Sequence, residues 1–222
     1  MLEYKYKVAG FDGFLTINSD WDKSEWQNAE EIVLMNKMGE EPLFRPEVRV
    51  KMMYNSENLY IIFKVNDKFV KCLTAEVNGP VYKDSCVEFF FSPNPDFPHH
   101  YFNLEINCGG TALFHFNTLA RKEKVLIEEA DISKLEIAHS MPLIVDPEIK
   151  EPVIWTVECR IPLGVLQKYS KIDLPARGIS WPANFYKIAE SGSNVHFITW
   201  SLIPLAKPDF HRPEYFGNIL FQ

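Results

Sequence analysis

Polar side chains that can form two hydrogen bonds at once recur at alternate positions of several apolar segments. They are Glu88, Asn103, Glu105, Asn107, Glu158, Arg160, Asn184 and Tyr186. Successive side chains of a β-strand point to opposite faces, so neighbouring strands would gather these groups on one face of a sheet. Carboxylate, amide and guanidinium groups can each engage two adjacent hydroxyls. The pattern therefore predicts a surface that recognises a ligand rich in vicinal hydroxyls, such as a sugar.

Aromatic residues between the strand-like segments would supply the apolar platforms that the face of a sugar ring requires. Tyr82 lies just before one such segment, and Phe210 with His211 lies near the C-terminus. The alternative interpretation is that one face of an antiparallel sheet is simply solvated, as in most β-sandwiches.

The elements that must position these groups are β-strands, because the dominant hydrophobic period is two. Residues 48–54 and 59–65 alternate in this way around an Asn-Ser-Glu-Asn turn, which predicts an antiparallel hairpin. Further strand-like runs cover residues 85–92, 100–107, 111–117, 153–161, 180–188, 196–200 and 217–222. Many short strands without alternating helices predict an all-β sandwich with at most one or two short helices.

Three segments are less regular. Residues 24–38 begin with a Ser-x-x-Gln capping-box pattern typical of a helix, but the apolar run 32–34 is equally compatible with an edge strand. Residues 162–169 start with proline at a first helical position, which predicts one or two helical turns. Three prolines in residues 140–152 predict a loop within one domain.

Length and composition restrict the class of protein. A chain of 222 residues is long enough for one large core, and we expect residues 1–222 to form a single domain. The 23 Lys and Arg against 30 Asp and Glu give a net charge of −7, and the lack of a basic cluster argues against a nucleic-acid partner. No apolar run approaches the roughly 20 residues that a transmembrane helix needs.

The N-terminus and the cysteines bear on the compartment. The first ten residues, MLEYKYKVAG, lack the basic and apolar regions of a signal peptide, which on sequence alone indicates a cytoplasmic chain or one already trimmed. Cys72, Cys86, Cys108 and Cys159 have no C-x-x-C spacing. We expect them to be small buried thiols and not a disulfide pair or a metal site.

Six segments together resemble the family 9 carbohydrate-binding modules and their close relatives. They are VYKDSCVEFFFSP (81–93), YFNLEINCGG (101–110), WTVECRIP (155–162), WPANFYKI (181–188), TWS (199–201) and FHRPEYFGNILF (210–221). Their order and spacing match from about residue 45 to the end. The most specific pieces are Asp84-Ser85-x-Val87-Glu88-x-Phe90 and Arg212-Pro213 followed by Phe216-Gly217. The resemblance implies an immunoglobulin-like or jelly-roll β-sandwich of the DOMON-like group.

The resemblance also implies a site in which two aromatic side chains enclose a terminal saccharide while strand residues bind its hydroxyls. By position, Glu88 corresponds to the carboxylate after the Asp-Ser pair, and Asn184 to a strand amide. Glu105 takes the place of a residue that is arginine in a characterised type of module. Tyr82 and Phe210 stand where tryptophans are expected.

Further implications of the resemblance concern partners and cofactors. A mono- or oligosaccharide, as from xylan or cellulose, is the implied ligand, and relatives are typically secreted or periplasmic modules attached to glycan-degrading enzymes. No cofactor is required. A structural calcium ion occurs in relatives, although no segment here is a dense Asp/Asn ligand loop.

We therefore predict a non-catalytic carbohydrate-binding domain associated with polysaccharide breakdown. The expected contacts are Tyr82, Glu88, Glu105, Asn107, Arg160, Asn184, Phe210 and His211. Trp155, Trp181 and Trp200 are expected in the core or at its rim, and Trp21 and Trp26 at one end of the sandwich.

Three alternatives belong to other classes. Glu88, Glu105 and Glu158 could supply the acid and base of a glycosidase, but a shallow exposed face does little to raise one pKa. Haem-binding relatives use Met and His ligands, for which Met52, Met53, Met141 and His196 are candidates by residue type only. The third alternative is an interaction domain whose polar face docks another protein.

Overall fold

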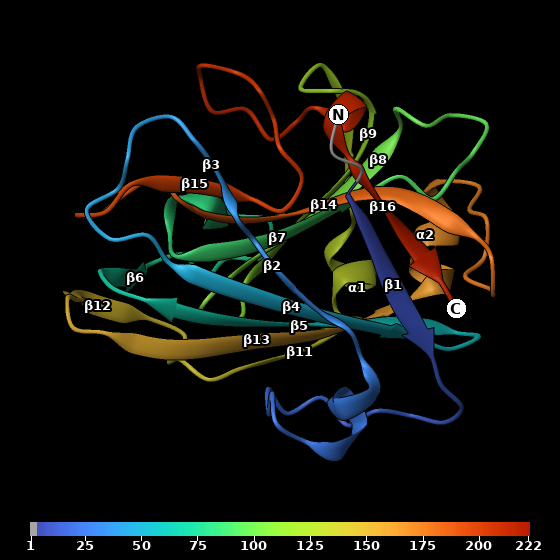
Figure 1. Ribbon diagram of the computed structural model, residues 1–222, viewed down its shortest axis with the longest axis horizontal. Coiled ribbons are helices and arrows are strands. Elements are labelled where there is room, and N and C mark those ends of the chain that lie inside the picture. The colour runs from blue at the N-terminus through green and yellow to red at the C-terminus, as the bar shows by residue number, and fades with distance from the viewer. Residues whose placement is uncertain (1–3) are drawn as a thin grey trace.

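The computed structural model describes residues 4–222, whose regular elements are almost all β-strands (Figure 1). The strands are β1 (Lys5–Gly10), β2 (Glu31–Val33), β3 (Asn36–Met38), β4 (Glu47–Tyr54), β5 (Asn58–Asp67), β6 (Val70–Cys72), β7 (Cys86–Phe91), β8 (Tyr101–Asn107), β9 (Ala112–Leu119), β10 (Glu123–Leu126), β11 (Glu136–His139), β12 (Val145–Ile149), β13 (Val153–Pro162), β14 (Ser180–Ala189), β15 (His196–Thr199) and β16 (Gly217–Phe221). The helices are α1 (Glu129–Ile132) and α2 (Leu163–Tyr169), with 3-10 turns η1 (Ser24–Asn28), η2 (Val81–Lys83) and η3 (Pro213–Tyr215).

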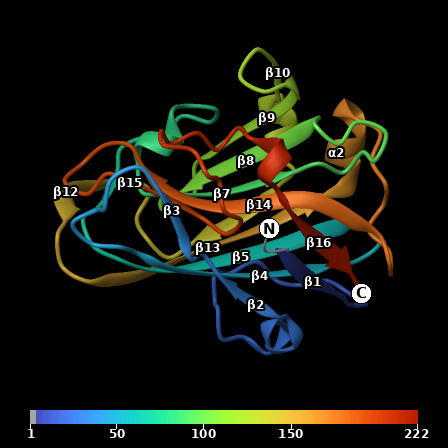
Figure 2. The same cartoon turned by 45° about the horizontal axis from the view of Figure 1, so that its top comes forward.

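The strands form two layers of a β-sandwich (Figures 1 and 2). The upper layer has the order β10-β9-β8-β7-β14-β16, and the lower layer has the order β4-β5-β13-β11. Strand β1 joins them, because Lys5–Val8 pair with β16 and Ala9–Gly10 pair with β4, both in parallel. The all-β sandwich predicted from the period of two is confirmed.

The core between the layers comes from alternate residues of each strand. In β7 and β8 the inward side chains are Val87, Phe89, Phe91, Phe102, Leu104 and Ile106, all in the main hydrophobic cluster. Phe185 of β14 stacks on Phe89 with ring centroids 5.0 Å apart, and it meets Phe63 of β5 at 6.4 Å. Trp155, Trp181 and Trp200 are buried in this core as predicted.

The outer face of the upper layer is also covered, which the sequence pattern did not predict. Every residue of β7 and β8 is buried, on both faces. Outward residues such as Phe90 and Tyr101 pack with Ile203 and Phe210 in a second hydrophobic cluster. The covering segment, residues 200–216, connects β15 to β16 and crosses this face in red in Figure 2.

A buried ion pair connects the two layers. Nζ of Lys187 in β14 lies 3.3 Å from Oδ2 of Asp67 in β5, and both side chains are 0% exposed. Nζ also lies 2.7 Å from Nε2 of His196. Burial, with the charge of Lys187, lowers the pKa of His196 well below its usual range. The histidine is therefore neutral and accepts a hydrogen bond from the lysine.

The local predictions can be compared with the elements. The hairpin is confirmed as β4 and β5, with Val48 paired to Val65, and the helical turns after Pro162 are confirmed as α2. Residues 24–38, left open between helix and strand, contain η1 followed by β2 and β3. The loop predicted for residues 140–152 instead contains β12, which pairs with β6.

Three further features can be compared with the predictions. Trp21 and Trp26 cover the outer face of the lower layer and do not close one end of the sandwich. Lys51 and Lys64 of that face lie 4.5 and 5.7 Å from the Trp21 ring. The four cysteines are buried and free, as predicted. Among residues 4–222, no helix is both long and apolar enough to cross a bilayer.

Candidate binding pocket

A pocket of about 320 Å³ lies on the outer face of the upper layer, beneath the segment that covers it. Its floor consists of outward side chains from three adjacent strands: Glu88 and Phe90 of β7, Asn103 and Glu105 of β8, and Leu113 and His115 of β9. Pairing brings them together, since Glu88 is opposite Glu105, and Asn103 is opposite both Phe90 and His115. The period of two in these strands therefore builds the floor directly.

Two buried carboxyl groups lie side by side on this floor. The residues Glu88 and Glu105 are 2% and 5% exposed. Oε1 of Glu105 accepts a hydrogen bond of 2.9 Å from Nδ2 of Asn103, whereas its buried Oε2 has no partner within the described residues. Burial raises the pKa of Glu105 to about 8. Burial and then repulsion from Glu105 raise the pKa of Glu88 well above its usual range.

This burial corrects the expectation of a shallow exposed face that leaves carboxyl pKa values unchanged. The covering segment removes water from the floor, and removal of water favours the neutral form of a carboxyl group. The two groups are therefore protonated at higher pH than ordinary glutamates.

Amide and imidazole groups surround the two carboxyl groups. Nδ2 of Asn117 donates a 2.5 Å hydrogen bond to Oδ1 of Asn103, which fixes the orientation of the Asn103 amide. Nδ1 of His115 lies 3.5 Å from Nδ2 of Asn103. Burial, and then the nearby Lys124, lower the pKa of His115 to about 4. His115 is thus neutral at physiological pH and does not supply a counter-charge.

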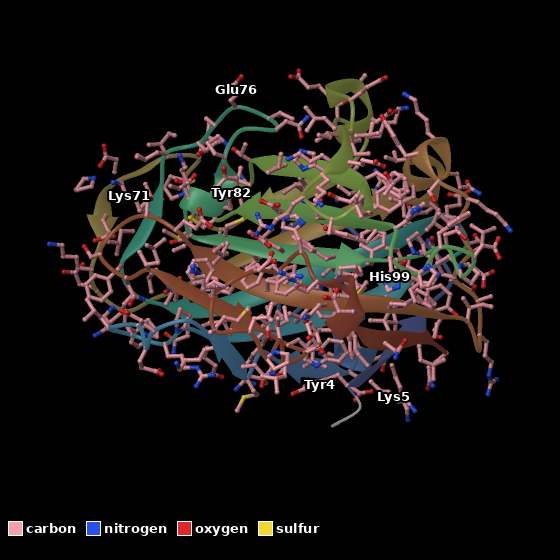
Figure 3. The ribbon with its side chains drawn as sticks, turned by 90° about the horizontal axis from the view of Figure 1, so that it is seen from above. Tyr4, Lys5, Lys71, Glu76, Tyr82 and His99 are labelled. Carbon is pink, nitrogen blue, oxygen red and sulfur yellow. The ribbon has the colours of Figure 1, made fainter. Side chains whose placement is uncertain are left out.

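Aromatic side chains form the walls. Tyr82 of η2 is half-buried at the pocket, and Figure 3 shows it beside the strands of the upper layer. Phe210 of the covering segment stacks on Tyr186 with ring centroids 4.2 Å apart, and its ring centroid lies 6.0 Å from that of Phe197 in a T-shaped arrangement. One face of Phe210 is therefore occupied by protein, while Tyr82 retains exposed ring surface.

His211 completes the wall next to Phe210. Its Nδ1 lies 2.7 Å from the hydroxyl of Tyr101. Burial, and then repulsion from Arg121, lower the pKa of His211 to about 3. The ring is therefore neutral, and its hydrogen-bonding tautomer depends on the tyrosine hydroxyl.

An ion pair connects the covering segment to the β9–β10 turn. Nη2 of Arg121 in the turn lies 2.8 Å from Oδ1 of Asp209 in the segment, and both residues line the pocket. Burial opposes ionisation of Asp209, but Arg121 and Arg212 outweigh it and lower its pKa. The contact joins the two sides of the pocket mouth.

Five of the eight predicted contact residues line this pocket: Tyr82, Glu88, Glu105, Phe210 and His211. They come from η2, β7, β8 and the covering segment. Residues separated by more than 120 positions are thus brought to one site.

The other three predicted residues lie elsewhere. Nδ2 of Asn107 donates to the carbonyl of Thr74 and to Oδ2 of Asp84, at 2.8 and 3.0 Å, so Asn107 holds adjacent strands and loops together. Asn184 is buried, and its Oδ1 accepts a 2.8 Å hydrogen bond from the backbone of Ser201. Both side chains form hydrogen bonds with neighbouring loop residues, and neither lines the pocket.

Arg160 lies in the other layer. Its strand, β13, lies between β5 and β11 in the lower layer, so Glu158 and Arg160 do not share a face with Glu88 and Glu105. Arg160 forms an ion pair with Glu136 of β11 at 3.1 Å. Glu158 accepts a hydrogen bond of 2.9 Å from Nε1 of Trp26. The alternation was read correctly within β13, but the sequence did not show which layer contains it.

Several pocket residues were not predicted as contacts. His115 and Leu113 alternate with the inward residues of β9, and that same period of two would have placed them on the floor. Arg121, Lys124, Glu190, Phe197 and Asp209 also line the pocket. Arg121, Glu190 and Asp209 lie outside strands, where no periodic signal indicates the direction of a side chain, whereas Lys124 and Phe197 lie within the short strands β10 and β15.

Metal and haem ligands were also considered. Within residues 4–222 no group of three or more His, Cys, Asp or Glu side chains is placed to hold a metal ion. Both ring nitrogens of His196 have protein partners, Lys187 and the carbonyl of Asn194. Met52 lies in the core between the layers. Within the described residues His196 and Met52 are thus occupied by protein contacts, and a structural calcium ion stays a prediction of the resemblance.

Comparison with known proteins gives one family. The family described as Carbohydrate-binding family 9 matches residues 16–221 of the chain. A sequence search with this chain finds no match among curated proteins.

Solved structures with the same fold include three of note. A protein from Bacteroides uniformis ATCC 8492, whose suggested role is carbohydrate binding, superposes with a TM-score of 0.86 at 24% identity, covering 100% of both chains. A family 9 carbohydrate-binding module from Caldicellulosiruptor kristjanssonii in complex with cellotriose has a TM-score of 0.66 at 16% identity, covering 99% of this chain and 94% of its own. The same organism's module in complex with glucose has a TM-score of 0.65 at 17% identity, covering 99% and 96%.

Proposed function

The chain belongs to carbohydrate-binding family 9, and we propose that it binds a saccharide, without cleaving it, in the pocket on the outer face of the upper layer. The observation that carries this proposal is the combination, in one pocket of about 320 Å³, of buried carboxyl and amide groups with the partly exposed ring of Tyr82.

This combination matches the chemistry of a sugar. Glu105 and Asn103 offer acceptors and donors for vicinal hydroxyls, and Tyr82 offers an apolar surface for the C–H face of the ring. A volume of about 320 Å³ is at the small end of the range for ligand pockets, about 300–1,000 Å³. The module neighbours in complex with glucose and cellotriose support a ligand of this class.

We further infer that the pocket takes the end of a saccharide chain. The covering segment and the Arg121–Asp209 ion pair line the pocket on the side away from the strands. A polysaccharide that continued in both directions along the strands would have to pass through them. A terminal unit would enter between them without displacing the segment.

The carboxyl groups support binding without catalysis. A glycosidase needs one carboxylic acid and one carboxylate, which requires environments that push the two pKa values apart. Here the pKa values of Glu88 and Glu105 are both raised by burial. A role beside a glycan-degrading enzyme would follow from the family and is part of the proposal.

The test is isothermal titration of the protein with a panel of neutral and amine-bearing mono- and oligosaccharides, each oligosaccharide with its reducing end intact and after reduction to the alditol. Tyr82→Ala should weaken binding about tenfold, because it removes the exposed apolar platform. Arg160→Ala is the matched control, since Arg160 lies in the lower layer, and its affinity should equal that of the unchanged protein.

The outcomes separate the possible sites. Loss of affinity in Tyr82→Ala but not in Arg160→Ala supports the pocket, and loss of binding on reduction supports chain-end recognition. The reverse pattern in the two variants would move the site to the lower layer. No binding to any saccharide would contradict the proposed function and favour a domain that docks another protein.

A further inference from the structure

Glu88 and Glu105 place two carboxyl groups next to each other on the pocket floor, where ionisation of both would create a like-charged pair. They are directly opposite on antiparallel strands β7 and β8. Side chains in this position have Cβ atoms about 4.5–5.5 Å apart, and like charges placed so are destabilising in a sheet. A protein that only needed hydroxyl acceptors here could use an amide at either position. Fold stability therefore does not explain why both positions are glutamate.

The pair also lacks protein partners. Of the four carboxyl oxygens, only Oε1 of Glu105 accepts a hydrogen bond within residues 4–222, from Asn103. Oε2 of Glu105 is buried without a partner, and Glu88 forms neither a hydrogen bond nor an ion pair with any described residue. Buried polar groups are normally hydrogen-bonded. An unpartnered, buried carboxyl group that lines a pocket indicates that the partner is a ligand.

The nearby cations do not neutralise this pair. Lys187 points to the other side of the layer, where it pairs with Asp67. Arg121 is paired with Asp209. Lys124 is exposed at the pocket and forms no ion pair within the described residues. The remaining charged neighbour, Glu190, is also exposed and adds to the negative potential that raises both pKa values.

We propose that the pocket selects an amino sugar, a saccharide with a free amine, whose ammonium group binds between Glu88 and Glu105. This proposal rests on the proposed function. An ammonium group brings one positive charge and three N–H donors, and it has no acceptor. It would stabilise the ionised form of the two carboxyl groups and satisfy the unpartnered oxygens with charge-assisted hydrogen bonds. A neutral hydroxyl provides a single donor and no charge, so the pair must retain a proton when such a sugar binds.

Proton release is a second consequence. In the free protein burial keeps the two carboxyl groups protonated to higher pH than ordinary glutamates. An ammonium group favours their ionised form, so its binding releases protons to the solvent. Binding of a neutral sugar does not favour ionisation of the carboxyl groups, so it should release no protons. The charged neighbours named above are present in both cases and do not change this contrast.

The experiment compares glucosamine, glucose and N-acetylglucosamine by isothermal titration at pH 6.5, with galactosamine and galactose as a second pair. A free amine is protonated at this pH, because its pKa lies near that of an α-amino group, about 8. We expect each amine to bind at least about tenfold more tightly than the matching neutral sugar. N-acetylglucosamine should bind no more tightly than glucose. In buffers of different ionisation enthalpy, the measured heat should change for the amines alone.

Two isosteric variants test the role of the pair itself. Glu88→Gln and Glu105→Gln keep the shape and the hydrogen-bonding capacity but remove the charge. Each should reduce the preference for the amine about tenfold, and change the affinity for the neutral sugar less than about threefold. Glu151→Gln is the control, since Glu151 is exposed in the turn before β13, and it should preserve both affinities.

The results distinguish this inference from the proposed function. Binding of the neutral sugars without a preference for either amine would overturn the amino-sugar proposal and leave the proposed function standing. A preference for the amines that both glutamine variants retain would also overturn it, because the selectivity would then come from other groups. If no saccharide binds, neutral or amine-bearing, both proposals fail.

Discussion

Single residues in this pocket have protonation behaviour that their type alone does not predict. Glu105 is a strand residue whose neighbours, Asn103 and Leu113, leave one carboxyl oxygen buried and unpartnered. The raised pKa follows from that environment, since burial disfavours the charged form. His115 and His211 are shifted the other way for the same physical reason. Burial in one site therefore favours the neutral form of both the carboxyl groups and the imidazoles.

At this scale we predict that Glu105→Gln changes how stability depends on pH. Between its ordinary pKa of 4.5 and its pKa of about 8 in the folded protein, Glu105 binds a proton more tightly when folded than when unfolded. The free energy of unfolding therefore falls as pH rises through this window. The glutamine variant lacks this loss. The free energy of unfolding of the variant, relative to that of the unchanged protein, should therefore rise by on the order of a few kcal/mol from pH 5 to pH 8.

The measurement is urea unfolding of both proteins at pH 5, 6.5 and 8. The histidines contribute equally to the two proteins, whereas removal of Glu105 also lowers the pKa of Glu88 and so reduces the loss of stability in the same direction. A difference in stability that stays constant from pH 5 to pH 8 would show that Glu105 is not buried in its protonated form.

The strands of the upper layer are buried on both faces, because the covering segment packs on the outer face and the lower layer packs on the inner face. On the outer face the segment between β15 and β16 covers β7 and β8, which creates the pocket. On the inner face Lys187 of β14 reaches Asp67 of β5 and connects the layers. Strand β14 therefore links the floor of the pocket to the lower layer.

For this pair of elements we predict strong coupling between Asp67 and Lys187. Asp67→Asn leaves a buried ammonium without its carboxylate, and Lys187→Met leaves the carboxylate without its ammonium. Each single change should lower the free energy of unfolding by about 3–5 kcal/mol. The double variant removes both charges and should lose clearly less than the sum of the two, with a coupling of about 2 kcal/mol.

Urea denaturation of the four proteins completes this cycle. Oδ2 of Asp67 also accepts a 3.3 Å hydrogen bond from Nε1 of Trp155, which the asparagine can retain. Strictly additive losses would indicate that the two side chains do not interact across the layers.

The whole molecule depends on β1, because this strand pairs with an edge of each layer. The hydroxyl of Tyr6 in β1 donates a 2.7 Å hydrogen bond to the carbonyl of Glu30 and accepts one of 2.6 Å from the backbone of Met52. Val8 contributes to the main core. The two layers are therefore one hydrogen-bonded structure, and the expectation of a single domain stays a prediction that unfolding can test.

We predict one cooperative unfolding transition for the chain, and its loss when residues 1–10 are deleted. The deletion exposes the edges of β16 and β4 and opens the core between the layers. Far-ultraviolet circular dichroism and tryptophan fluorescence should give coincident transitions for the intact protein. Tyr6→Phe should be milder, with a loss of about 1–3 kcal/mol, because it leaves the backbone N–H of Met52 unpartnered.

Two separate transitions in the intact protein would contradict the single-domain prediction. A deletion variant that still unfolds cooperatively, with an unchanged dependence on urea, would show that β1 does not hold the layers together.

The sequence by itself determined the longer strands and the direction of their side chains, but it did not predict β1, β6, β10, β11 or β12. Alternation in residues 85–92 and 100–107 identified the outward position of Glu88 and Glu105, because the side-chain period of a strand is a local property of the backbone. The motifs around Asp84 and Arg212 identified the family, which the match over residues 16–221 confirms.

Only the tertiary structure decided which strands share a layer and what covers the outer face. Arg160 alternates as Glu88 does, yet β13 pairs with β5 and lies in the other layer. Strand pairing is set by contacts between residues far apart in the chain, and these leave no periodic signal. For the same reason the sequence did not show that residues 200–216 cover the polar face. That cover changes a solvated surface into a pocket with two buried carboxyl groups. Burial removes water from these groups and thereby raises their pKa values.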